Sequence, residues 1–197
     1  MKLIQVLNMF LVATVGLLSA QSKDIIGYYP SWRFMERDYL VTQASIPYEK
    51  LTIINYAFFY PTPEGDLLGL NPEADAYLLN DLIDLKSGEN IENTSIIDYA
   101  EKFGVRVMLS LGGWEDSGNF PAIAADGVKR KTFAKSCVDV IKRYGFHGID
   151  IDWEFPGLAS HNGTPADTKN YTILLQEVRD SLTAYSKITN EYYALSI

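Results

Sequence analysis

The sequence predicts an α/β fold in which parallel strands alternate with helices, and three observations support this prediction. Strand-like and helix-like segments follow each other along the 197 residues of the chain. The strand-like segments are almost continuously apolar, as expected for strands that are buried on both faces. No linker or low-complexity tract interrupts the alternation, which indicates a single domain. A doubly wound sheet and a (β/α)₈ barrel both agree with this order of elements.

The first half of the chain contains two expected strands and a less regular region. Residues 25–29 and 51–60 are rich in apolar, aromatic and β-branched side chains, and each is short enough for a strand. Residues 61–94 contain several prolines and glycines that indicate turns. We expect one helix within this region, near residues 74–85.

The next helix is expected from Ser95 to Phe103. Ser95 and Asp98 have the spacing of a capping box, in which each residue bonds the backbone of the other at a helix start. Gly104 would end the helix, because glycine readily takes the left-handed conformation found there. Residues 105–111 then form the third expected strand.

The second half repeats the pattern. One helical stripe of apolar residues precedes Gly145 and consists of Ala134, Cys137, Val138, Ile141 and Tyr144. A strand is expected over residues 147–154, and residues 192–197 begin a fifth strand. Between these two strands lies a further amphipathic helix, with Tyr171, Leu174, Leu175, Val178, Leu182 and Tyr185 on its apolar face.

The strand expected at residues 147–154 carries acids on every second residue. Asp150, Asp152 and Glu154 alternate with apolar residues, so the three carboxyl groups share one face. Successive acids are about 6.7 Å apart along the backbone. Each carboxylate disfavours ionisation of the next, and such clusters are typical of catalytic sites. Carboxylates at the C-terminal end of a parallel strand are also where barrel enzymes hold their catalytic groups, which favours the barrel.

The beginning of the chain has the pattern of a signal peptide. Lys2 precedes an apolar run at residues 9–18, and Leu18-Ser-Ala20 is typical of a cleavage site. The run is too short to span a membrane. We therefore expect residues 1–20 to be removed and the mature protein, residues 21–197, to be secreted, with no membrane association afterwards.

Composition restricts the partners and cofactors that we expect. The net charge is −8, and loss of Lys2 with the signal peptide makes it −9, which argues against nucleic acid and anionic membranes as partners. Cys137 is the only cysteine, and the two histidines lack the spacing of metal ligands. No dinucleotide-binding fingerprint or nucleophile elbow is present. We expect no metal and no cofactor, and nothing in the sequence sets the oligomeric state.

Aromatic residues and glycines follow the ends of the first three strands. Residues 110–114 read SLGGW, so that Gly113 allows close approach of the backbone and Trp114 leaves the strand. Tyr28 and Phe58 stand at the ends of the first two strands. Aromatic faces suit the apolar faces of sugar rings, although a packed turn and an ordinary core are equally compatible with these residues taken singly.

These segments together resemble a known family. GIDIDWEFPG at residues 148–157 resembles the strand-four signature Asp-x-x-Asp-x-Asp-x-Glu of family 18 glycoside hydrolases, the chitinases and their relatives. SLGGW at 110–114, LTIINYAF at 51–58 and GYYPSW at 27–32 are similar to the family's strands three, two and one. The resemblance covers nearly all of the chain after residue 20, in the family's order.

The resemblance implies a (β/α)₈ barrel that hydrolyses β-1,4 bonds in chitin or N-acetylglucosamine oligosaccharides with retention. It implies that Glu154 protonates the leaving oxygen and that Asp152 orients the substrate's acetamido group, which acts as the nucleophile in this family. Asp150 would share a proton with Asp152. By the same resemblance, Tyr28, Phe58, Gly113 and Trp114 belong to the sugar-binding floor.

The sequence departs from the family in two ways. His147 stands where the signature has its first Asp, and we expect it to affect stability or the pKa of Asp150. Only about five strands are present, whereas a complete barrel has eight and usually about 250 residues. We therefore expect a truncated barrel, the N-terminal portion of a family 18 catalytic domain, that is close to inactive by itself.

Two other functions agree with the same motifs. One is an endo-β-N-acetylglucosaminidase or a peptidoglycan-directed hydrolase, which uses the same arrangement of acids. The other is a non-catalytic chitin-binding lectin on the same fold. The presence of Glu154 favours an enzyme, and the sequence that follows it favours the chitinases.

Overall fold

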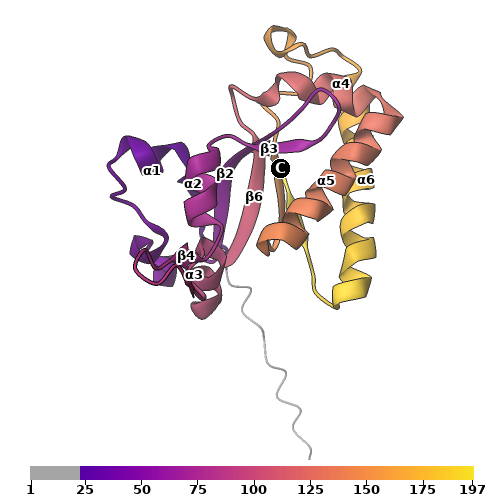
Figure 1. The fold of residues 1–197 in the computed structure, drawn as a ribbon. Helices are drawn as coiled ribbons and strands as arrows, with labels where there is room; N and C mark the ends of the chain where they lie inside the picture. The colour runs from indigo at the N-terminus through magenta and orange to yellow at the C-terminus, as the bar shows by residue number, and fades with distance from the viewer. Residues whose placement is uncertain (1–22) are drawn as a thin grey trace, which may run out of the picture.

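The computed structural model describes residues 23–197, so the signal peptide expected at residues 1–20 lies outside the described residues. A parallel sheet forms the centre of the molecule, with the spatial order β1-β2-β6-β7-β8 (Figure 1). Its strands are β1 (Ile26–Pro30), β2 (Ile53–Pro61), β6 (Arg106–Gly112), β7 (Gly148–Asp152) and β8 (Ala194–Ser196). All four pairings between them are parallel, as the alternation of strands and helices predicts.

Helices connect the strands and cover the outer face of the sheet. The two long ones, α5 (Gly127–Tyr144) and α6 (Asp167–Thr189), lie side by side in Figure 1, and α4 (Phe120–Ala125) packs against both. The shorter ones are α1 (Trp32–Glu36), α2 (Pro72–Leu78) and α3 (Ile96–Lys102). Apolar residues of the sheet and the helices form one continuous core between the two layers.

Local sequence signals explain where two helices begin or end. The Ser95 side chain accepts a hydrogen bond from the Asp98 backbone, and the Asp98 carboxylate accepts one from the Ser95 backbone, which confirms the capping box of α3. Gly145 follows α5 in the left-handed conformation with a φ of 84°. Its N–H donates to the Ile141 carbonyl and closes the helix at the expected residue.

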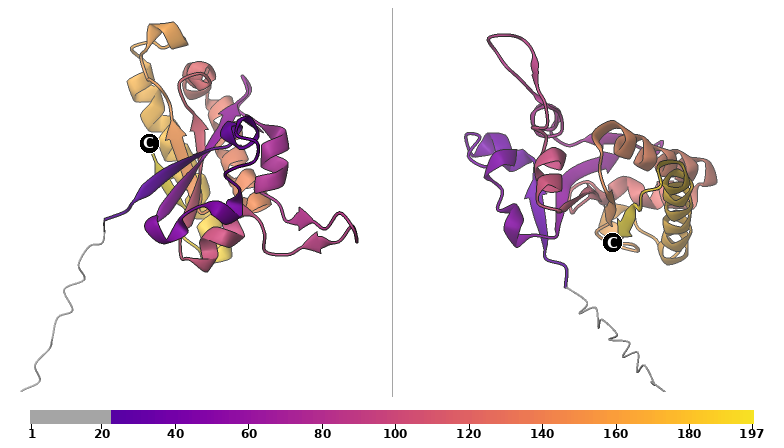
Figure 2. Two further views of the ribbon diagram at one scale, coloured as in Figure 1. Left: turned by 90° about the vertical axis from the view of Figure 1, so that its left-hand side faces the viewer. Right: turned by 90° about the horizontal axis from the view of Figure 1, so that it is seen from below.

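Residues 61–94 differ from the expectation of one helix at residues 74–85. The helix α2 ends at Leu78, and β4 (Leu82–Ile83) and β5 (Asn90–Ile91) form an antiparallel hairpin that protrudes from the body (Figure 2). The hydroxyl of Thr94 accepts from the Leu82 backbone, and the Asp81 carboxylate accepts from the Thr94 backbone. These side-chain bonds offer the backbone an alternative to the helix, which explains why the helical periodicity fails here.

One further strand of the main sheet was not expected. The strand β3 (Leu67–Gly69) folds back on the end of β2 and pairs with it antiparallel. It places Gly69 against the side chain of Asp75 in α2. The connection after β2 is therefore part of the sheet rather than an irregular loop.

The sheet is open within the described residues. β1 pairs only with β2 and β8 pairs only with β7, so each has one strand edge without a partner. Five parallel strands with helices outside them agree with the expected truncated (β/α)₈ barrel. The sheet does not close into a barrel between residues 23 and 197.

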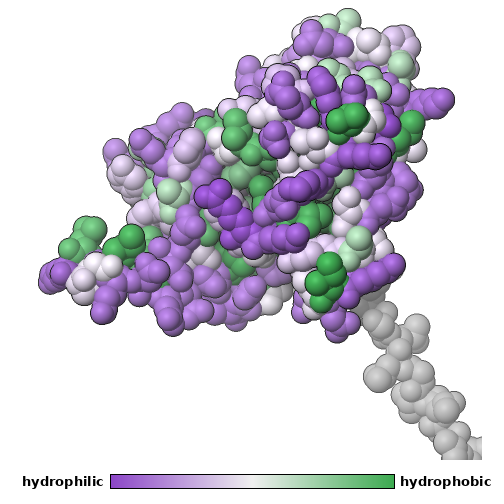
Figure 3. Space-filling view, turned by 45° about the vertical axis from the view of Figure 1, so that its right-hand side comes forward, coloured by the Kyte–Doolittle hydropathy of each residue, from purple (hydrophilic) through white to green (hydrophobic). Residues whose placement is uncertain are grey.

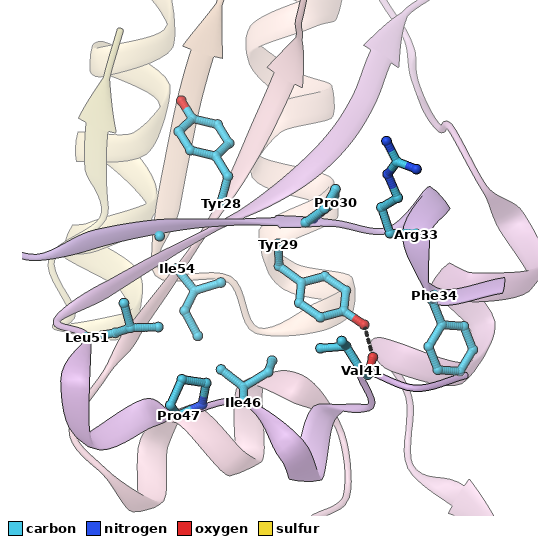
Figure 4. A pocket seen from close by; sticks show the side chains of 11 residues that line it. Tyr28, Tyr29, Pro30, Arg33, Phe34, Val41, Ile46, Pro47, Leu51 and Ile54 are labelled. Carbon is cyan, nitrogen blue, oxygen red and sulfur yellow. Dashed lines mark hydrogen bonds between the residues drawn. The ribbon is translucent and has the colours of Figure 1, made fainter. Parts of the chain in front are cut away.

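The two faces of β1 have different environments. Tyr29 points into an apolar cavity of about 220 Å³ between β1 and the segment around Ile46, where its hydroxyl donates to the Val41 carbonyl at 2.6 Å (Figure 4). Tyr28 points to the opposite side of the strand, as alternation requires (Figure 4). The cavity of Figure 4 therefore belongs to the outer layer, and Tyr28 to the inner face.

The surface agrees with the negative charge of the chain. Hydrophilic residues cover most of the face shown in Figure 3, and the hydrophobic side chains on it form several separate groups. None of the helices between residues 23 and 197 combines the length with the apolar composition that a bilayer-spanning segment requires.

Candidate active site

The acidic residues lie at the C-terminal end of β7. The strand ends at Asp152, so Trp153 and Glu154 belong to the following loop rather than to a strand over residues 147–154. Ile149 and Ile151 pack into the core with Trp153, whereas Asp150 bonds side chains of the inner face. The strand geometry thus separates the acids from the core, as the alternation predicts for Asp150 and Asp152.

Three hydroxyl groups hold the carboxyl group of Asp150, which is only 3% exposed. Ser110 of β6 donates to Oδ2 at 2.7 Å, and Tyr28 of β1 donates to the same oxygen at 3.0 Å. Ser196 of β8 donates to Oδ1 at 2.6 Å. Because the donors come from three different strands, the carboxyl group is fixed in one orientation.

Asp152 lies next to Asp150 on the same face and is more open. Burial raises its pKa to about 6, and the negative charges of Glu154 and Asp150 add to the effect. The carboxyl group of Asp152 therefore changes its protonation within the range in which many hydrolases work. The pKa of Asp152 thus depends first on burial and then on the charges of the neighbouring acids.

Ser117 positions the backbone of Glu154. Its buried hydroxyl accepts from the Glu154 N–H at 2.9 Å and donates to the Gly113 carbonyl at 2.8 Å. The Gly113 N–H in turn donates to the Asp152 carbonyl at 2.8 Å. The loop that carries Glu154 is thereby attached to the loop after β6, and sequence reasoning missed the residue that makes this attachment.

A cavity of about 400 Å³ with aromatic walls lies at the same end of the sheet, between the ends of β2 and β6. The ring of Phe58 stacks on Trp32 with 5.8 Å between centroids, and its centroid is 6.3 Å from that of Tyr28. Trp114 borders the cavity and is 51% exposed. The structure therefore brings together Phe58 and Trp114 directly, and Tyr28 joins them to Asp150.

Gly113 is required by its surroundings. Its φ is +79°, and a Cβ at this position would lie 2.7 Å from the Phe58 ring. A larger residue would strain the backbone at this φ and would force the Phe58 ring to shift. The glycine therefore determines how closely the end of β6 approaches the aromatic wall.

His147 stands just before β7 and contacts β6 and α3. Its Nδ1 accepts from the Val107 backbone at 3.1 Å, and its Nε2 is 3.7 Å from the carboxylate of Glu101 in α3. Residues three apart on a strand point to opposite faces, so the ring points away from Asp150. These contacts support the expected effect of His147 on stability, and an effect on Asp150 stays a prediction. Burial lowers the pKa of His147 itself.

The described part of the chain contains no evident metal centre. No group of three or more His, Cys, Asp or Glu side chains between residues 23 and 197 is arranged to hold an ion. Cys137 is buried in α5, and burial raises the pKa of its thiol, as expected of a structural cysteine.

Comparison with known proteins agrees with this arrangement. The sequence model of the family described as "Glycosyl hydrolases family 18" matches residues 24–197. The chain is 32% identical to Chitinase A1 of Niallia circulans, with 91% of this chain and 30% of that protein aligned. It is 33% identical to Endochitinase 1 of Metarhizium robertsii, with 81% and 37% aligned.

Solved structures give the same result. The fold resembles that of chitinase ChiA74 from Bacillus thuringiensis with a TM-score of 0.75 and 28% identity, over 89% of this chain and 35% of that one. It also resembles the Group IV chitinase of Ostrinia furnacalis in complex with allosamidin, with a TM-score of 0.66 and 25% identity, over 83% and 41%. The chain spans about a third of the length of the curated relatives named above. It belongs to glycosyl hydrolase family 18.

Proposed function

We propose that the protein containing this chain hydrolyses β-1,4 bonds between N-acetylglucosamine units in chitin or its oligosaccharides. The main support for this proposal is the group of acids at the end of β7. Asp152, with a pKa raised to about 6, lies between the fixed carboxyl group of Asp150 and the loop residue Glu154. Relatives named chitinases support the same reaction.

The three acids have different environments and therefore suit different roles. Glu154 follows the strand and would donate a proton to the leaving glycosidic oxygen as the C1–O bond breaks. The oxygen of the substrate's acetamido group would form the new bond to C1, in the substrate-assisted manner that this family uses. Water would then attack C1 from the face that the leaving group had occupied and give a proton to the Glu154 carboxylate, while the bond between C1 and the acetamido oxygen breaks. The β configuration is thereby retained.

Asp152 and Asp150 would support the acetamido group. An ionised Asp152 would accept a hydrogen bond from the acetamide N–H. Its negative charge would stabilise the positive charge that develops on the ring formed by the acetamido group and C1. Asp150 would keep Asp152 in place and share its proton, because its own orientation is fixed by Ser110, Tyr28 and Ser196. Glu154 thus donates a proton while Asp152 is ionised, because the different environments of the two acids allow different protonation states.

The aromatic residues support a neutral sugar as the ligand. Phe58 and Trp114 border the cavity beside the acids, and Tyr28 connects that wall to Asp150. Stacking on aromatic faces needs no charge on the ligand, in agreement with the negative net charge of the chain. We further infer that Gly113 shapes the cavity and that residues 1–20 direct the protein out of the cell, where chitin is found.

Product analysis with the full-length gene product tests the proposal. Proton NMR of the N-acetylglucosamine tetramer during cleavage should show that the β anomer forms first. An α anomer as the first product would contradict the substrate-assisted mechanism. Cleavage of peptidoglycan or of N-linked glycans in place of chitin would favour the alternative hydrolases, and binding without any cleavage would favour a lectin.

A further inference from the structure

His161 contacts the backbone of the proposed acid. It ends a short 3₁₀ turn (Ala159–His161) in the loop after β7, and its Nδ1 is 2.7 Å from the carbonyl oxygen of Glu154. A carbonyl oxygen can only accept a hydrogen bond, so the Nδ1 atom of His161 carries the proton. The bond joins the middle of the loop to a residue near its start.

The same imidazole ring packs on the indole of Trp114. Their ring centroids are 4.5 Å apart and their planes are inclined by 57°. Trp114 belongs to the loop after β6, whereas His161 belongs to the loop after β7. One side chain therefore contacts both the backbone of Glu154 and a ring of the proposed sugar-binding wall.

The loop of His161 is held in place by bonds that do not involve its ring. The carboxylate of Asp167, which is buried, accepts from the backbones of Gly157 at 3.0 Å and Thr164 at 2.9 Å. The side chain of Asn162 donates to the Gly118 carbonyl at 3.2 Å, so a second contact connects the two loops. The ring is thus presented by an already ordered loop, and a change of the ring alone should leave the loop folded.

We propose that His161 is a positioning residue that fixes Trp114 relative to Glu154. The proposal rests on the proposed function, in which a sugar on Trp114 must be aligned with the carboxyl group of Glu154. The bond to the Glu154 carbonyl restrains the backbone of the acid, and the contact with the indole restrains the ring of Trp114 on which the sugar would stack. Since both contacts come from one ring, sugar and acid are held in a single relative arrangement.

The two contacts can be separated by substitution. His161→Asn keeps a nitrogen donor at the position of Nδ1 but removes the ring, so it should retain the bond to Glu154 and lose the packing on Trp114. His161→Phe keeps a ring beside Trp114 but has no donor. Thr168→Ala, at an exposed position near the start of α6, is the matched control.

The variants are made in the full-length gene product and assayed with N-acetylglucosamine oligosaccharides. His161→Phe should lower kcat about threefold to tenfold with KM nearly unchanged, since a neutral hydrogen bond contributes that much. His161→Asn should raise KM about threefold to tenfold with kcat nearly unchanged, since the value of an aromatic contact is similar. Thr168→Ala should leave both constants unchanged.

The outcomes separate this proposal from a purely structural role. A structural role would lower the melting temperature and the amount of active enzyme in both variants, without opposite effects on kcat and KM. That result, or wild-type constants in both variants, would overturn the proposal. A wild-type protein that neither cleaves nor binds the oligosaccharides would overturn the proposed function. If the wild-type protein cleaves them, the proposed function stands, and the constants of the two variants then decide the role of His161.

Discussion

The hydroxyl of Tyr28 on β1 lies 3.0 Å from Oδ2 of Asp150 on β7, although β2 and β6 stand between these strands. In a flat sheet, three strand spacings would separate the two backbones by about 14 Å. The sheet must therefore curve toward its inner face to bring the side chains together. That curvature is what a segment of a barrel requires, and it places a hydroxyl of the first strand on an acid of the fourth strand of the barrel.

Tyr28→Phe is expected to lower kcat/KM about threefold to thirtyfold, because Asp150 loses one of its three hydroxyl donors. The fold should be unaffected, since the side chain of Tyr28 is 53% exposed. Steady-state kinetics of the full-length gene product and its melting temperature measure both effects. Tyr192→Phe, which removes the hydroxyl of a more exposed tyrosine, is the control. Equal kinetics in the two variants would contradict the role given to the Tyr28 hydroxyl.

Gly113→Ala should destabilise the protein by more than Gly88→Ala. Both glycines have positive φ values, +79° and +75°, so the backbone strain of about 1 kcal/mol is common to the two variants. Only at Gly113 would the new methyl group meet a neighbour, the ring of Phe58 at 2.7 Å. Chemical denaturation of both variants gives the difference. Equal losses would mean that the Phe58 ring moves aside without cost.

Local chemistry made much of the fold predictable. The capping pair of Ser95 and Asp98 and the glycine at position 145 set helix ends that agree with the structure. The strands β2 and β6 could be located because parallel strands buried on both faces are continuously apolar. The alternation of Asp150 and Asp152 with isoleucines also fixed which side chains share a face.

Contacts between distant segments could not be predicted from periodicity. Ser196 and Ser110 bond Asp150 across strand pairs, and an isolated serine in a sequence does not indicate its partner. The hairpin after α2 depends on the hydroxyl of Thr94, twelve residues from the backbone group that it bonds. The position of His147 in the signature does not show which side chains it contacts, whereas its odd spacing from Asp150 predicts that the two side chains lie on opposite faces.

Asp75→Asn is expected to change how stability depends on pH. Burial raises the pKa of Asp75 to about 6, although its bond with Tyr56, at 2.6 Å, acts in the opposite direction. A folded-state pKa above the unfolded value means that stability falls as pH rises from about 4 to about 6. Asparagine keeps an acceptor for Tyr56 and carries no charge, so the variant should be more stable at pH 7.5 by about 1–3 kcal/mol.

Denaturation of the full-length gene product at pH 4 and at pH 7.5 measures this effect. At pH 4 the wild-type carboxyl group is protonated in the folded state, so the two proteins should be nearly equal. Asp98→Asn is not a suitable control because Asp98 caps α3, whereas Asp180→Asn changes an exposed carboxylate of α6. A variant less stable than wild type at pH 7.5 would contradict the raised pKa of Asp75.

The pH dependence of hydrolysis should report Asp152. If its ionised form supports the acetamido group, kcat/KM should rise with pH through a midpoint near the pKa of about 6. Asp150→Asn removes one of the negative charges that raise this pKa, so the midpoint of the residual activity should move to lower pH. A midpoint that stays in place, or moves to higher pH, would mean that a group other than Asp152 controls the rise of kcat/KM with pH.

The two unpaired strand edges predict self-association of the described part. Residues 21–197 expressed alone expose the outer edges of β1 and β8, and such edges are templates for pairing with other chains. Light scattering should detect association at micromolar concentration, and activity on the oligosaccharides should be close to zero. A soluble, active monomer of these residues would refute this expectation.

If Glu154 donates the proton to the leaving oxygen, its replacement by glutamine should remove hydrolysis and spare binding. Glu154→Gln in the full-length gene product keeps the shape of the side chain, whereas Glu73→Gln changes an exposed glutamate of α2 as the control. Hydrolysis of the N-acetylglucosamine tetramer should fall by about 10²- to 10⁴-fold in the first variant only, with binding of the tetramer retained. Hydrolysis that persists in Glu154→Gln at the wild-type rate would contradict the assignment.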